Sequence, residues 1–548
     1  MKNKEKIFIG VAWPYVNGDL HVGHLAGYLL PADIFARFNR FKGRDVLMAS
    51  GSDCFGTPIT IEAEKRNLSP EEIVNEYHPK HLDLFEKAGI SFDIFTKTNT
   101  KNHIKISQEF FLKFLEKGYI FKDVSKQHYD EKEKRFLPDR YVEGKCPHCN
   151  FEEARSDQCD NCGRVLDQGE LKNPVSKLSG NKVILKESEH YFFDLEKLQP
   201  FIEEYFKDKS GEWKEWVMKE TKNWLKRGLN SRSFSRDLEW GVPFPIDKIP
   251  ANKKIENIEN KRFYVWWEAV IGYLSASIEW SETKNNNWED FWKNKDAKHF
   301  YFMGKDNLPY HTMFWPAELH LYNEKLNLPD VHVINQYLNF EGNKFSKSRG
   351  VTIDSKEIIE KYGLDSVRFY INSIMPENSD SNFNWDDFID KHNNVLIGNL
   401  GNFINRTLTL AKDVSFDKNY IEEEVKNKIN NLTKEAEKNL ENNQFRNYLD
   451  SILSLSDFGN KYLTKKEPWK KEKEDKEKII TNALLVVLAL QVIIKPLLIE
   501  TYKKLVNLTG LDFDNWSDDV FSEVLNFLEK VKIKKPSPLF EKIDKGSN

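Results

Sequence analysis

An apolar run near the amino terminus, followed by a turn, a helical pattern and a second apolar run, is the feature that most constrains the fold. The first run covers residues 7–12, and a Trp-Pro-Tyr segment and an Asn-Gly-Asp turn follow it. Apolar residues then recur at helical spacing from Leu25 to Phe38, with Pro31 expected to kink or split the helix. The second run, residues 46–49, ends in a Ser-Gly-Ser-Asp turn. Continuous apolar runs between turns are typical of buried strands in a parallel sheet, so this opening predicts a doubly wound α/β domain.

Two changes of character divide the rest of the chain. Residues 118–232 hold four of the five cysteines, many charges and few periodic segments, which indicates an insertion. Strand-like runs then return, where we expect the second half of the α/β domain, at residues 262–267, 299–303 and 331–334. Beyond residue 393 the pattern is helical, in segments 394–410, 421–440, 444–463 and 479–505. The expected fold is α/β, a Rossmann-like doubly wound parallel sheet split by the insertion and followed by an all-α helical bundle.

Length and charge limit the kinds of function. The chain has 548 residues, of which 39% are hydrophobic and 31% charged, so several domains with cores of their own are expected. The formal net charge of −4 excludes a long-range basic field as the main means of binding nucleic acid. Any such contact must use local patches of Lys and Arg.

No segment predicts export or a membrane span. The first six residues are polar and the apolar run after them is short, unlike a secretory signal. The most hydrophobic stretch, residues 483–494, is interrupted by Gln491 and ended by Lys495-Pro496, so we expect a buried helix. Five cysteines in so long a chain indicate a metal site in a reducing, cytoplasmic compartment rather than a disulfide framework.

The clustered cysteines form two C-x-x-C pairs. Cys146 and Cys149 are followed ten positions later by Cys159 and Cys162. Four thiolates complete a tetrahedral Zn²⁺ shell with no open position, so the spacing predicts one structural zinc in the insertion. His148 could replace a thiolate, and four unrelated thiols are the alternative.

Two histidines mark the turn between the first strand and the first helix. His21 and His24 are three positions apart, so both lie on one face of the first helical turn. A helix N-terminus presents unpaired N–H groups to a phosphate, and Gly23 lets a nucleotide approach the backbone. The pattern favours phosphate binding, and two incidental histidines at a capped helix are the alternative.

A second cationic motif lies about 320 positions downstream. Lys344 and Lys347 stand in a Lys-Phe-Ser-Lys-Ser-Arg-Gly run with a glycine on each side. Such a loop could close over a polyphosphate and neutralise the charge that develops on leaving pyrophosphate. Taken alone, the run is more typical of a basic surface turn.

Together the two motifs resemble those of the class I aminoacyl-tRNA synthetases, over nearly the whole chain. Within the class the sequence is most similar to the methionyl enzymes, because further blocks match them in the same order. These blocks are residues 12–18, 53–58, Trp266, 269–273 and 304–307. A cysteine knuckle in the connective insertion agrees with the same family.

The resemblance implies activation of L-methionine by ATP with Mg²⁺, giving methionyl-adenylate, and transfer to the 3′-terminal adenosine of tRNA(Met). The implied catalytic residues are His21, His24, Lys344 and Lys347. The implied ATP-binding residues are His21, Gly23, His24, Gly304, Asp306, Lys344 and Lys347. The implied methionine-binding residues are Ala12, Trp13, Tyr15, Asp53, Trp266, Ala269, Tyr273 and His311. Aromatic side chains suit a polarizable thioether, Asp53 would hold the α-ammonium group, and ordinary core packing is the alternative for the aromatic residues.

The helical part would read the anticodon. By resemblance the residues are Asn402 and Arg406, four apart on one helix face, and Trp469, on which an unpaired base could stack. Helix capping and a surface ion pair are the alternatives for Asn402 and Arg406.

The expected parts are the catalytic domain, first half, 1–117; the connective insertion, 118–232; the catalytic domain, second half, 233–325; the stem-contact region, 326–390; and the anticodon-binding domain, 391–548. A monomer is expected, because no further tRNA-binding, dimer-forming domain follows the bundle.

Five positions depart from the family without removing a group that the chemistry requires. Phe345 replaces a common methionine in the lysine loop, Tyr310 replaces a frequent phenylalanine, and Trp13 stands where many members have leucine. Asn335-Gln336 stands where many members have His-Gly, so neither residue is given an ATP role.

Three rival interpretations remain. A synthetase for valine, leucine or isoleucine would carry a much larger insertion than residues 118–232. A non-catalytic tRNA-binding relative would not need the retained histidines and lysines. A small-molecule nucleotidyltransferase with the same two motifs would have no use for the long helical domain.

Overall fold

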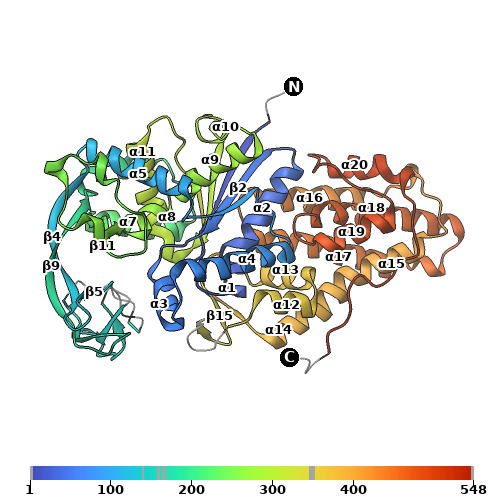
Figure 1. Cartoon of the computed structure of the whole chain (residues 1–548). Helices are drawn as coiled ribbons and strands as arrows, with labels where there is room; N and C mark the ends of the chain where they lie inside the picture. Colours follow the sequence, from blue (N-terminus) through green and yellow to red (C-terminus); the bar gives the residue numbers. More distant parts are fainter. Residues whose placement is uncertain are drawn as a thin grey trace.

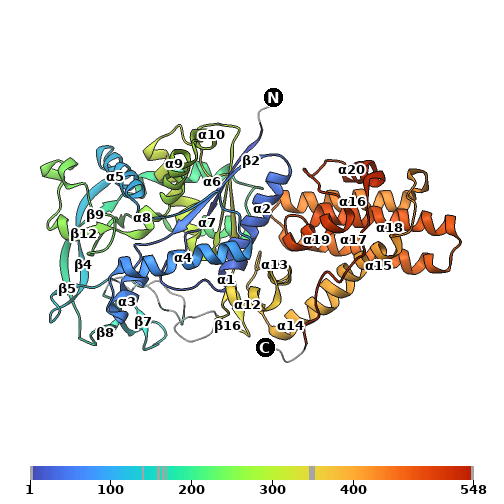
Figure 2. The ribbon, with the colours of Figure 1, turned by 45° about the vertical axis from the view of Figure 1, so that its right-hand side comes forward.

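The computed structural model describes residues 4–138, 141–156, 159, 161–162, 166, 169–344 and 352–544, with the backbone alone for residues 343–344. The molecule is elongated: a central sheet with its helices lies between a β-rich lobe and an all-helical end (Figure 1). The view turned by 45° keeps this order of parts (Figure 2).

Five parallel strands form the central sheet, in the order β14–β13–β1–β2–β3. They are β1 (Lys6–Val11), β2 (Asp45–Ser52), β3 (Ile94–Lys97), β13 (Lys298–Gly304) and β14 (Val331–Asn335). β1 and β2 are largely buried, as their continuous apolar sequences predict. The strand order reverses between β1 and β13, and the insertion enters the chain between β3 and β13. The expected doubly wound sheet split by an insertion is therefore confirmed, and β14 lies within it, beyond the boundary expected at residue 325.

The first crossover is one continuous helical segment of three parts. These are α1 (Val22–His24), the π-helical turn η1 (Leu25–Leu29) and α2 (Leu30–Phe41). Pro31 lies in the first turn of α2, where its missing N–H costs little. A kink or split of the helix was expected at Pro31, and the structure has a π-helical turn just before this proline instead. The other helices before the insertion are α3 (Thr57–Arg66), α4 (Pro70–Ala88) and α5 (Lys101–Glu116).

The insertion is built on a long antiparallel ribbon with a small sheet at its tip. The ribbon's sheet contains β4 (Ile120–Asp130), β5 (Arg135–Phe136), β9 (Ile184–Phe193) and β10 (Arg232–Ser233). The tip contains β6 (Val142–Lys145), β7 (Ala154–Arg155) and β8 (Lys172–Ser176) around a small core of its own. The tip also contacts α3, because the Tyr141 hydroxyl donates to Thr60 Oγ1 at 2.7 Å. Helices α6 (Gln199–Lys207) and α7 (Glu215–Arg227) follow the ribbon.

One expected strand is wrong. Of residues 262–267, only the first two are in a strand, β12 (Lys261–Phe263), which pairs antiparallel with β11 (Ser235–Asp237) outside the central sheet. Trp266 and Trp267 lie in a short helix, α8 (Val265–Ala269). Periodicity cannot separate a buried strand from a buried helix in so short an apolar run. The elements up to β14 are α9 (Gly272–Lys284), α10 (Glu289–Trp292), η7 (Lys305–Asn307), η8 (Tyr310–Phe314) and α11 (Trp315–Tyr322).

A small mixed sheet and four helical segments connect the central sheet to the helical end. The sheet contains β15 (Leu338–Phe340), β16 (Asn343–Lys344) and β17 (Ser381–Phe383). The helices are α12 (Ser355–Tyr362), α13 (Leu364–Ser373), α14 (Trp385–Asp390) and the π-helical η10 (Lys391–Gly401).

Helices are the only regular secondary structure among the described residues of the carboxyl-terminal part, as expected. Its helices are α15 (Asn402–Ala411), α16 (Glu423–Glu441), α17 (Phe445–Lys466), α18 (Lys473–Ile494), α19 (Ile499–Thr509) and α20 (Val520–Phe527). The segment predicted as one helix, residues 479–505, is two helices, because the chain turns between α18 and α19 at Pro496.

Helix α18 is long and apolar enough to cross a membrane by length and composition, but 89% of its most apolar window is buried inside the protein. The prediction of a buried helix is confirmed. The helix has 22 residues and is thus longer than its apolar stretch. Gln491 does not interrupt it, because its carboxamide donates to Leu511 O at 2.7 Å and accepts from Thr509 Oγ1 at 3.1 Å.

Candidate active site

The histidine turn is capped by its own side chains. Nδ1 of His21 accepts from the Gly23 backbone N–H at 3.1 Å, and Nδ1 of His24 accepts from the His21 backbone N–H at 3.1 Å. The two rings lie 4.0 Å apart. Because each Nδ1 accepts a backbone N–H, the proton of each neutral ring lies on Nε2. Two Nε2–H donors therefore project from the start of the first crossover helix.

The chain that follows the lysine loop is hydrogen-bonded to this turn. The Val22 N–H donates to Ile353 O at 3.2 Å, and the Ser355 N–H donates to Leu20 O at 3.4 Å. His21 and Asp354 form an antiparallel bridge. Of the lysine loop itself, the backbone of Lys344 lies in β16, and residues 345–351, including Lys347, lie outside the described residues. The histidine turn thus lies beside residues 353–355, where the described chain resumes after the lysine loop.

Most predicted substrate-binding residues follow the carboxyl ends of the strands. Ala12, Trp13 and Tyr15 follow β1, Asp53 follows β2, and Gly304 ends β13. The segment after β1 runs beside the segment after β2, because the Val16 N–H donates to Asp53 O at 3.1 Å and the Asp53 N–H to Pro14 O at 2.8 Å. This edge, where strand order reverses, is where open α/β sheets bind ligands.

Aromatic side chains from three segments pack at this edge. Trp266 stacks on Tyr310 with ring centroids 4.2 Å apart and meets Tyr15 edge-on at 6.4 Å. The Tyr273 hydroxyl lies 2.7 Å from His311 Nε2. Burial lowers the pKa of His311 to about 4, so the ring is neutral. Its Nδ1 then donates to Asn307 O at 2.9 Å, and its Nε2 accepts from Tyr273.

Trp13 closes this group against two backbone segments. A Cβ added at Gly51 would lie 2.1 Å from the Trp13 ring, and one added at Gly272 would lie 2.7 Å from it. The indole therefore fits only because both positions lack a side chain. Ala12, which precedes Trp13, and Ala269, three positions before Gly272, are both buried, with exposed fractions of 5% and 7%.

Asp53 is a buried carboxylate that lacks a cation. Its side chain is buried, and burial together with the charge of Glu268 raises its pKa well above the ordinary value, although the Phe55 N–H bonds it. In the part of the chain that the structure describes, no Lys, Arg or His lies within ion-pair distance of it. An ammonium ligand would supply the missing charge.

On the other side of β1, Gly304 and Asp306 begin the segment after β13. Asp306 is exposed and accepts a hydrogen bond from the Tyr337 hydroxyl. The neighbouring Lys305 pairs with Asp380 at 2.7 Å and lies 4.0 Å from the Tyr337 ring. The two predicted ATP-binding residues thus lie at the same carboxyl edge as the amino-acid-binding candidates, beside the chain that leads into β15.

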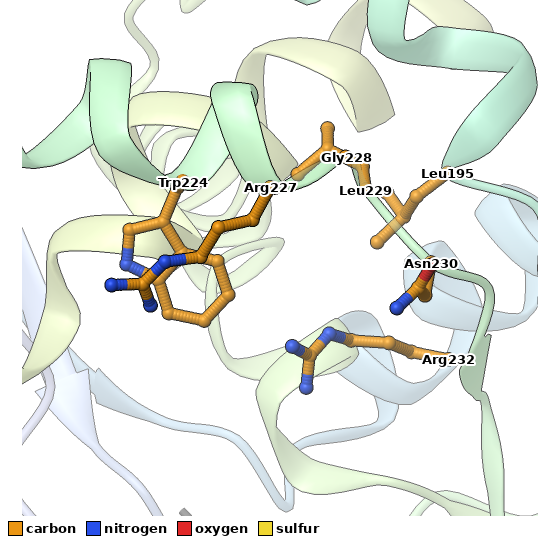
Figure 3. Close-up of a pocket in the computed structure, with 7 residues that line it drawn as sticks. All are labelled: Leu195, Trp224, Arg227, Gly228, Leu229, Asn230 and Arg232. Carbon is orange, nitrogen blue, oxygen red and sulfur yellow. The ribbon is translucent and has the colours of Figure 1, made fainter.

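A separate cavity of about 150 Å³ opens at the end of α7 (Figure 3). It is lined by Leu195, Trp224, Arg227, Gly228, Leu229, Asn230 and Arg232, none of which is a predicted site residue. The Arg232 guanidinium lies 5.6 Å from the Trp224 ring and 5.9 Å from that of Phe314. Phe314 in turn meets Tyr310, the stacking partner of Trp266, at 5.4 Å. The cavity is therefore two aromatic rings away from the predicted amino-acid pocket.

The four clustered cysteines converge at the tip of the insertion. Their Sγ atoms all lie within 4.8 Å of one another. Two of the separations are 4.0 Å, between Cys146 and Cys162, and 3.6 Å, between Cys149 and Cys159. A tetrahedral zinc with Zn–S bonds of about 2.3 Å requires sulfur atoms about 3.8 Å apart. The donor set and its spacing therefore fit a metal ion.

The predicted anticodon residues lie together at the far end of the molecule. Asn402 and Arg406 are one turn apart on α15. The Arg406 guanidinium lies 5.5 Å from the ring of Trp469, which is 48% exposed. The structure thus brings these three residues together as a surface group.

Comparisons with known proteins give two matches that cover the chain. Residues 7–408 match the family model of tRNA synthetases class I (M), and residues 416–548 match the anticodon binding domain of methionyl tRNA ligase. The chain belongs to the methionyl-tRNA synthetase family.

Individual relatives agree. The methionine–tRNA ligase of Thermoplasma volcanium is 41% identical over 547 residues, which cover 98% of both chains. That of Thermomicrobium roseum is 41% identical over 541 residues, 95% of this chain and 89% of the relative. Among solved structures, Mycobacterium tuberculosis methionyl-tRNA synthetase in complex with methionyl-adenylate has the same fold, with a TM-score of 0.77 at 21% identity. That match covers 98% of this chain and 99% of the other.

In this member of the methionyl-tRNA synthetase family, the structure adds a buried pair that sequence reasoning missed. His103 Nε2 lies 2.7 Å from Glu268 Oε2, and His103 Nδ1 lies 2.8 Å from Ser275 Oγ. Burial lowers the pKa of His103 to about 3 and raises the pKa of Glu268 well above its ordinary value. The sequence could have pointed to Glu268, because it lies between the predicted site residues Trp266 and Ala269. No sequence pattern pointed to His103.

Proposed function

We propose that the protein is a methionine–tRNA ligase, which activates L-methionine with ATP and transfers it to the 3′-terminal adenosine of tRNA(Met). The observation that carries this proposal is the hydrogen bonding between the histidine turn and the chain that follows the lysine loop. It supports a single site in which both cationic motifs meet one nucleotide triphosphate.

In the first step a methionine carboxylate oxygen attacks the α-phosphorus of ATP and forms an O–P bond. The bond between the α-phosphorus and the oxygen that bridges to the β-phosphate breaks, and pyrophosphate leaves with that oxygen and the electron pair. His21 and His24 each offer an Nε2–H donor to phosphoryl oxygens. Lys344 and Lys347 neutralise the charge on the leaving pyrophosphate. Positioning and electrostatics suffice for such phosphoryl chemistry, so the proposal needs no covalent enzyme intermediate.

The amino acid would lie at the carboxyl edge between β1 and β2. Asp53 pairs with its α-ammonium group, because that buried carboxylate has no cation among the described residues. Trp13, Tyr15 and Trp266 supply aromatic contacts for the thioether, with Ala12, Ala269, Tyr273 and His311 completing the pocket. Gly23, Gly304 and Asp306 are the remaining ATP contacts.

Two metal ions belong to the proposal. Mg²⁺ arrives with ATP as the substrate complex. Zn²⁺ would be held by Cys146, Cys149, Cys159 and Cys162, whose sulfur spacing fits a tetrahedral ion. With four protein ligands it has no open position, so it stabilises the tip of the insertion and takes no part in the reaction.

The tRNA would contact both ends of the molecule. Asn402, Arg406 and Trp469 would meet the anticodon, and Arg227 and Arg232 add local positive charge near the amino-acid pocket. We propose the domain division given by sequence, with the second catalytic half extended through β14. A monomer in the cytoplasm completes the proposal, and the clustered thiols support a reducing compartment.

Methionine-dependent exchange of pyrophosphate into ATP tests the reaction. Replacing both Lys344 and Lys347 by alanine should slow exchange about 10²–10³-fold, because charge stabilisation of the leaving group is lost. The KM for methionine should change less than about twofold, since neither lysine contacts the amino acid. Lys356→Ala, which removes an exposed lysine from α12, is the matched control and should leave exchange unchanged.

Pyrophosphate exchange that depends on valine, leucine or isoleucine, and not on methionine, would show that the protein is a synthetase for that amino acid. Equal losses in exchange and in methionine binding for the double lysine variant would contradict the role given to the loop. ATP binding with no exchange activity for any amino acid would support a non-catalytic relative.

A further inference from the structure

Three asparagine side chains form a hydrogen-bonded chain beside the predicted anticodon residues. Asn399 lies in η10, Asn402 begins α15, and Asn460 lies on the neighbouring helix α17. Asn460 Nδ2 lies 3.1 Å from Asn399 Oδ1, and Asn402 Nδ2 lies 3.3 Å from Asn460 Oδ1. Asn460 was not among the residues singled out from the sequence.

Backbone carbonyls set the direction of this chain. Asn399 Nδ2 donates to Leu453 O at 3.2 Å, so its Oδ1 must turn toward Asn460. Asn460 Nδ2 donates to that oxygen, to Asn399 O at 3.0 Å and to Ser456 O at 3.3 Å. Since these acceptors cannot donate, the Asn460 amide cannot flip without losing all three contacts. Its Oδ1 is therefore left as an acceptor for Asn402.

The consequence falls on Asn402, which is exposed at the surface. Its Nδ2 is held by Asn460, so its own Oδ1 is the end of the carboxamide that is left to accept from a ligand. One turn further along α15, Arg406 lies over the ring of Trp469. A stacking surface, a cation and an oriented acceptor thus occur together.

We propose that Asn460 is a positioning residue that orients the Asn402 carboxamide so that its oxygen accepts a hydrogen bond from an anticodon base carrying an amino group. This inference rests on the proposed function and adds to it how the first anticodon base is selected. Cytosine presents an exocyclic amino donor where uracil presents a carbonyl acceptor. An unpaired loop base exposes that edge to protein.

The genetic code makes this distinction necessary for a methionine enzyme that reads the anticodon. The methionine codon AUG and the isoleucine codon AUA differ only in the third base, which pairs with the first anticodon base. Cytosine at that position specifies methionine, and uracil does not. If Asn460 fixes the Asn402 oxygen as an acceptor, that oxygen attracts the amino group of cytosine and repels the carbonyl of uracil. A carboxamide that could rotate would instead form a hydrogen bond with either base.

The test compares two tRNA transcripts that differ only in cytosine or uracil at the first anticodon position. For each, kcat/KM of aminoacylation is measured with wild-type protein and with Asn460→Leu, which keeps the volume and removes the amide. We expect the preference for cytosine to fall about tenfold, the size of one discriminating hydrogen bond. Methionine-dependent pyrophosphate exchange should be unchanged, because Asn460 lies on the distant bundle.

Two further variants separate orientation from packing. Asn460→Asp keeps the oxygen that accepts from Asn402 and should retain more of the preference than Asn460→Leu. Asn447→Leu replaces an exposed asparagine on the same helix whose side chain bonds Gln444, and it should leave both transcripts unaffected.

An equal loss of kcat/KM for both transcripts in Asn460→Leu would overturn the proposal, because that residue would then support only the packing of the helices. An unchanged preference would overturn it as well. If the wild-type protein showed no methionine-dependent pyrophosphate exchange, the proposed function itself would be overturned, and not only the role of Asn460.

Discussion

Among single residues, Asp53 is a buried carboxyl group of the candidate site whose pKa is raised well above the ordinary value. Its carboxylate is buried, it has no cation among the described partners, and burial and Glu268 raise its pKa. Such a group is costly in the absence of a ligand and gains most from an ammonium ion that enters with its own charge. Under the proposed function, binding of the amino acid's ammonium group would therefore offset the cost of burying this carboxylate.

Replacing this carboxylate should weaken methionine binding specifically. For Asp53→Asn we expect the KM for methionine to rise about 100-fold, since a buried charge-assisted contact contributes about 3 kcal/mol, while the KM for ATP changes little. Steady-state pyrophosphate exchange measures both. Asp45→Asn, at the opposite end of β2, is the matched control.

The same carboxylate predicts a pH dependence. Because its pKa is raised, protonation begins at a higher pH than for an ordinary aspartate, and kcat/KM for methionine should fall as the pH is lowered through that range. A profile that stays flat down to about pH 4, the ordinary aspartate value, would contradict the assignment.

Residue roles were predictable only through the family resemblance. Periodicity alone would have left Trp266 and Tyr273 as core side chains. The contact between His103 and Glu268 joins residues 165 positions apart, which no local pattern reports. Physical reasoning on sequence therefore reached the residue types of the site but not the partners that set their protonation.

Among the elements, the strands and helices that were predicted well are those with long, strongly periodic or continuously apolar sequences. β1, β2, α16 and α17 follow their sequence patterns within a few residues. The failures have local causes: a short aromatic run became helix α8 instead of a strand, and Pro496 divided one expected helix into α18 and α19. Tertiary packing decides between strand and helix in a short apolar run, whereas proline ends a helix through its own backbone geometry.

The tip of the insertion is the element whose stability should depend on a metal. It has a small core of its own that includes Cys146 and Cys159, and the four sulfur atoms lie within 4.8 Å of one another. Purified protein should contain about one zinc per chain, and Cys159→Ser should lower that content and make the tip sensitive to proteolysis. Elemental analysis and limited proteolysis measure the two effects.

Cys54→Ser provides the control for this experiment, because Cys54 is buried in another core cluster and should not affect metal content. Full zinc occupancy in Cys159→Ser, or pure wild-type protein without metal, would contradict the four-thiolate site.

Across the whole molecule, one guanidinium group joins three parts of the chain. Arg368, on α13, donates to Asp33 Oδ2 at 2.8 Å in the first crossover helix. It also donates to Ala88 O at 3.1 Å and to Leu497 O at 2.7 Å, in the turn before α19. The catalytic sheet, the connecting helices and the bundle are thereby packed around a single buried ion pair.

Breaking that pair should destabilise the whole protein. For Arg368→Met we expect a loss of about 3 kcal/mol in the free energy of unfolding, because the buried Asp33 carboxylate would keep only the partly exposed Arg37 as an ion-pair partner. Urea unfolding measures it, and Lys461→Met, which breaks an exposed pair with Asp457, should have almost no effect.

The pH dependence of this effect has a defined sign. Burial alone would raise the pKa of Asp33, but Arg37, Arg368 and Ser91 more than offset this, so its pKa lies below the ordinary value. The stabilisation is therefore complete above about pH 4, the pKa in the unfolded chain, and is lost as the pH falls through the lower folded value. A difference between wild type and Asp33→Asn that grew on acidification would contradict this.

The hydrogen bonds between the histidine turn and Ile353 have a consequence for how the reaction is started. Lys347 and Ile353 are six positions apart in the sequence, and a fully extended chain of that length spans about 20 Å. In the proposed reaction, a tether of this length would give Lys347 an effective concentration on the order of millimolar beside the histidine turn. Under the proposed function, covalent attachment would therefore keep this lysine available to an arriving triphosphate, and no separate lobe would have to supply the charge.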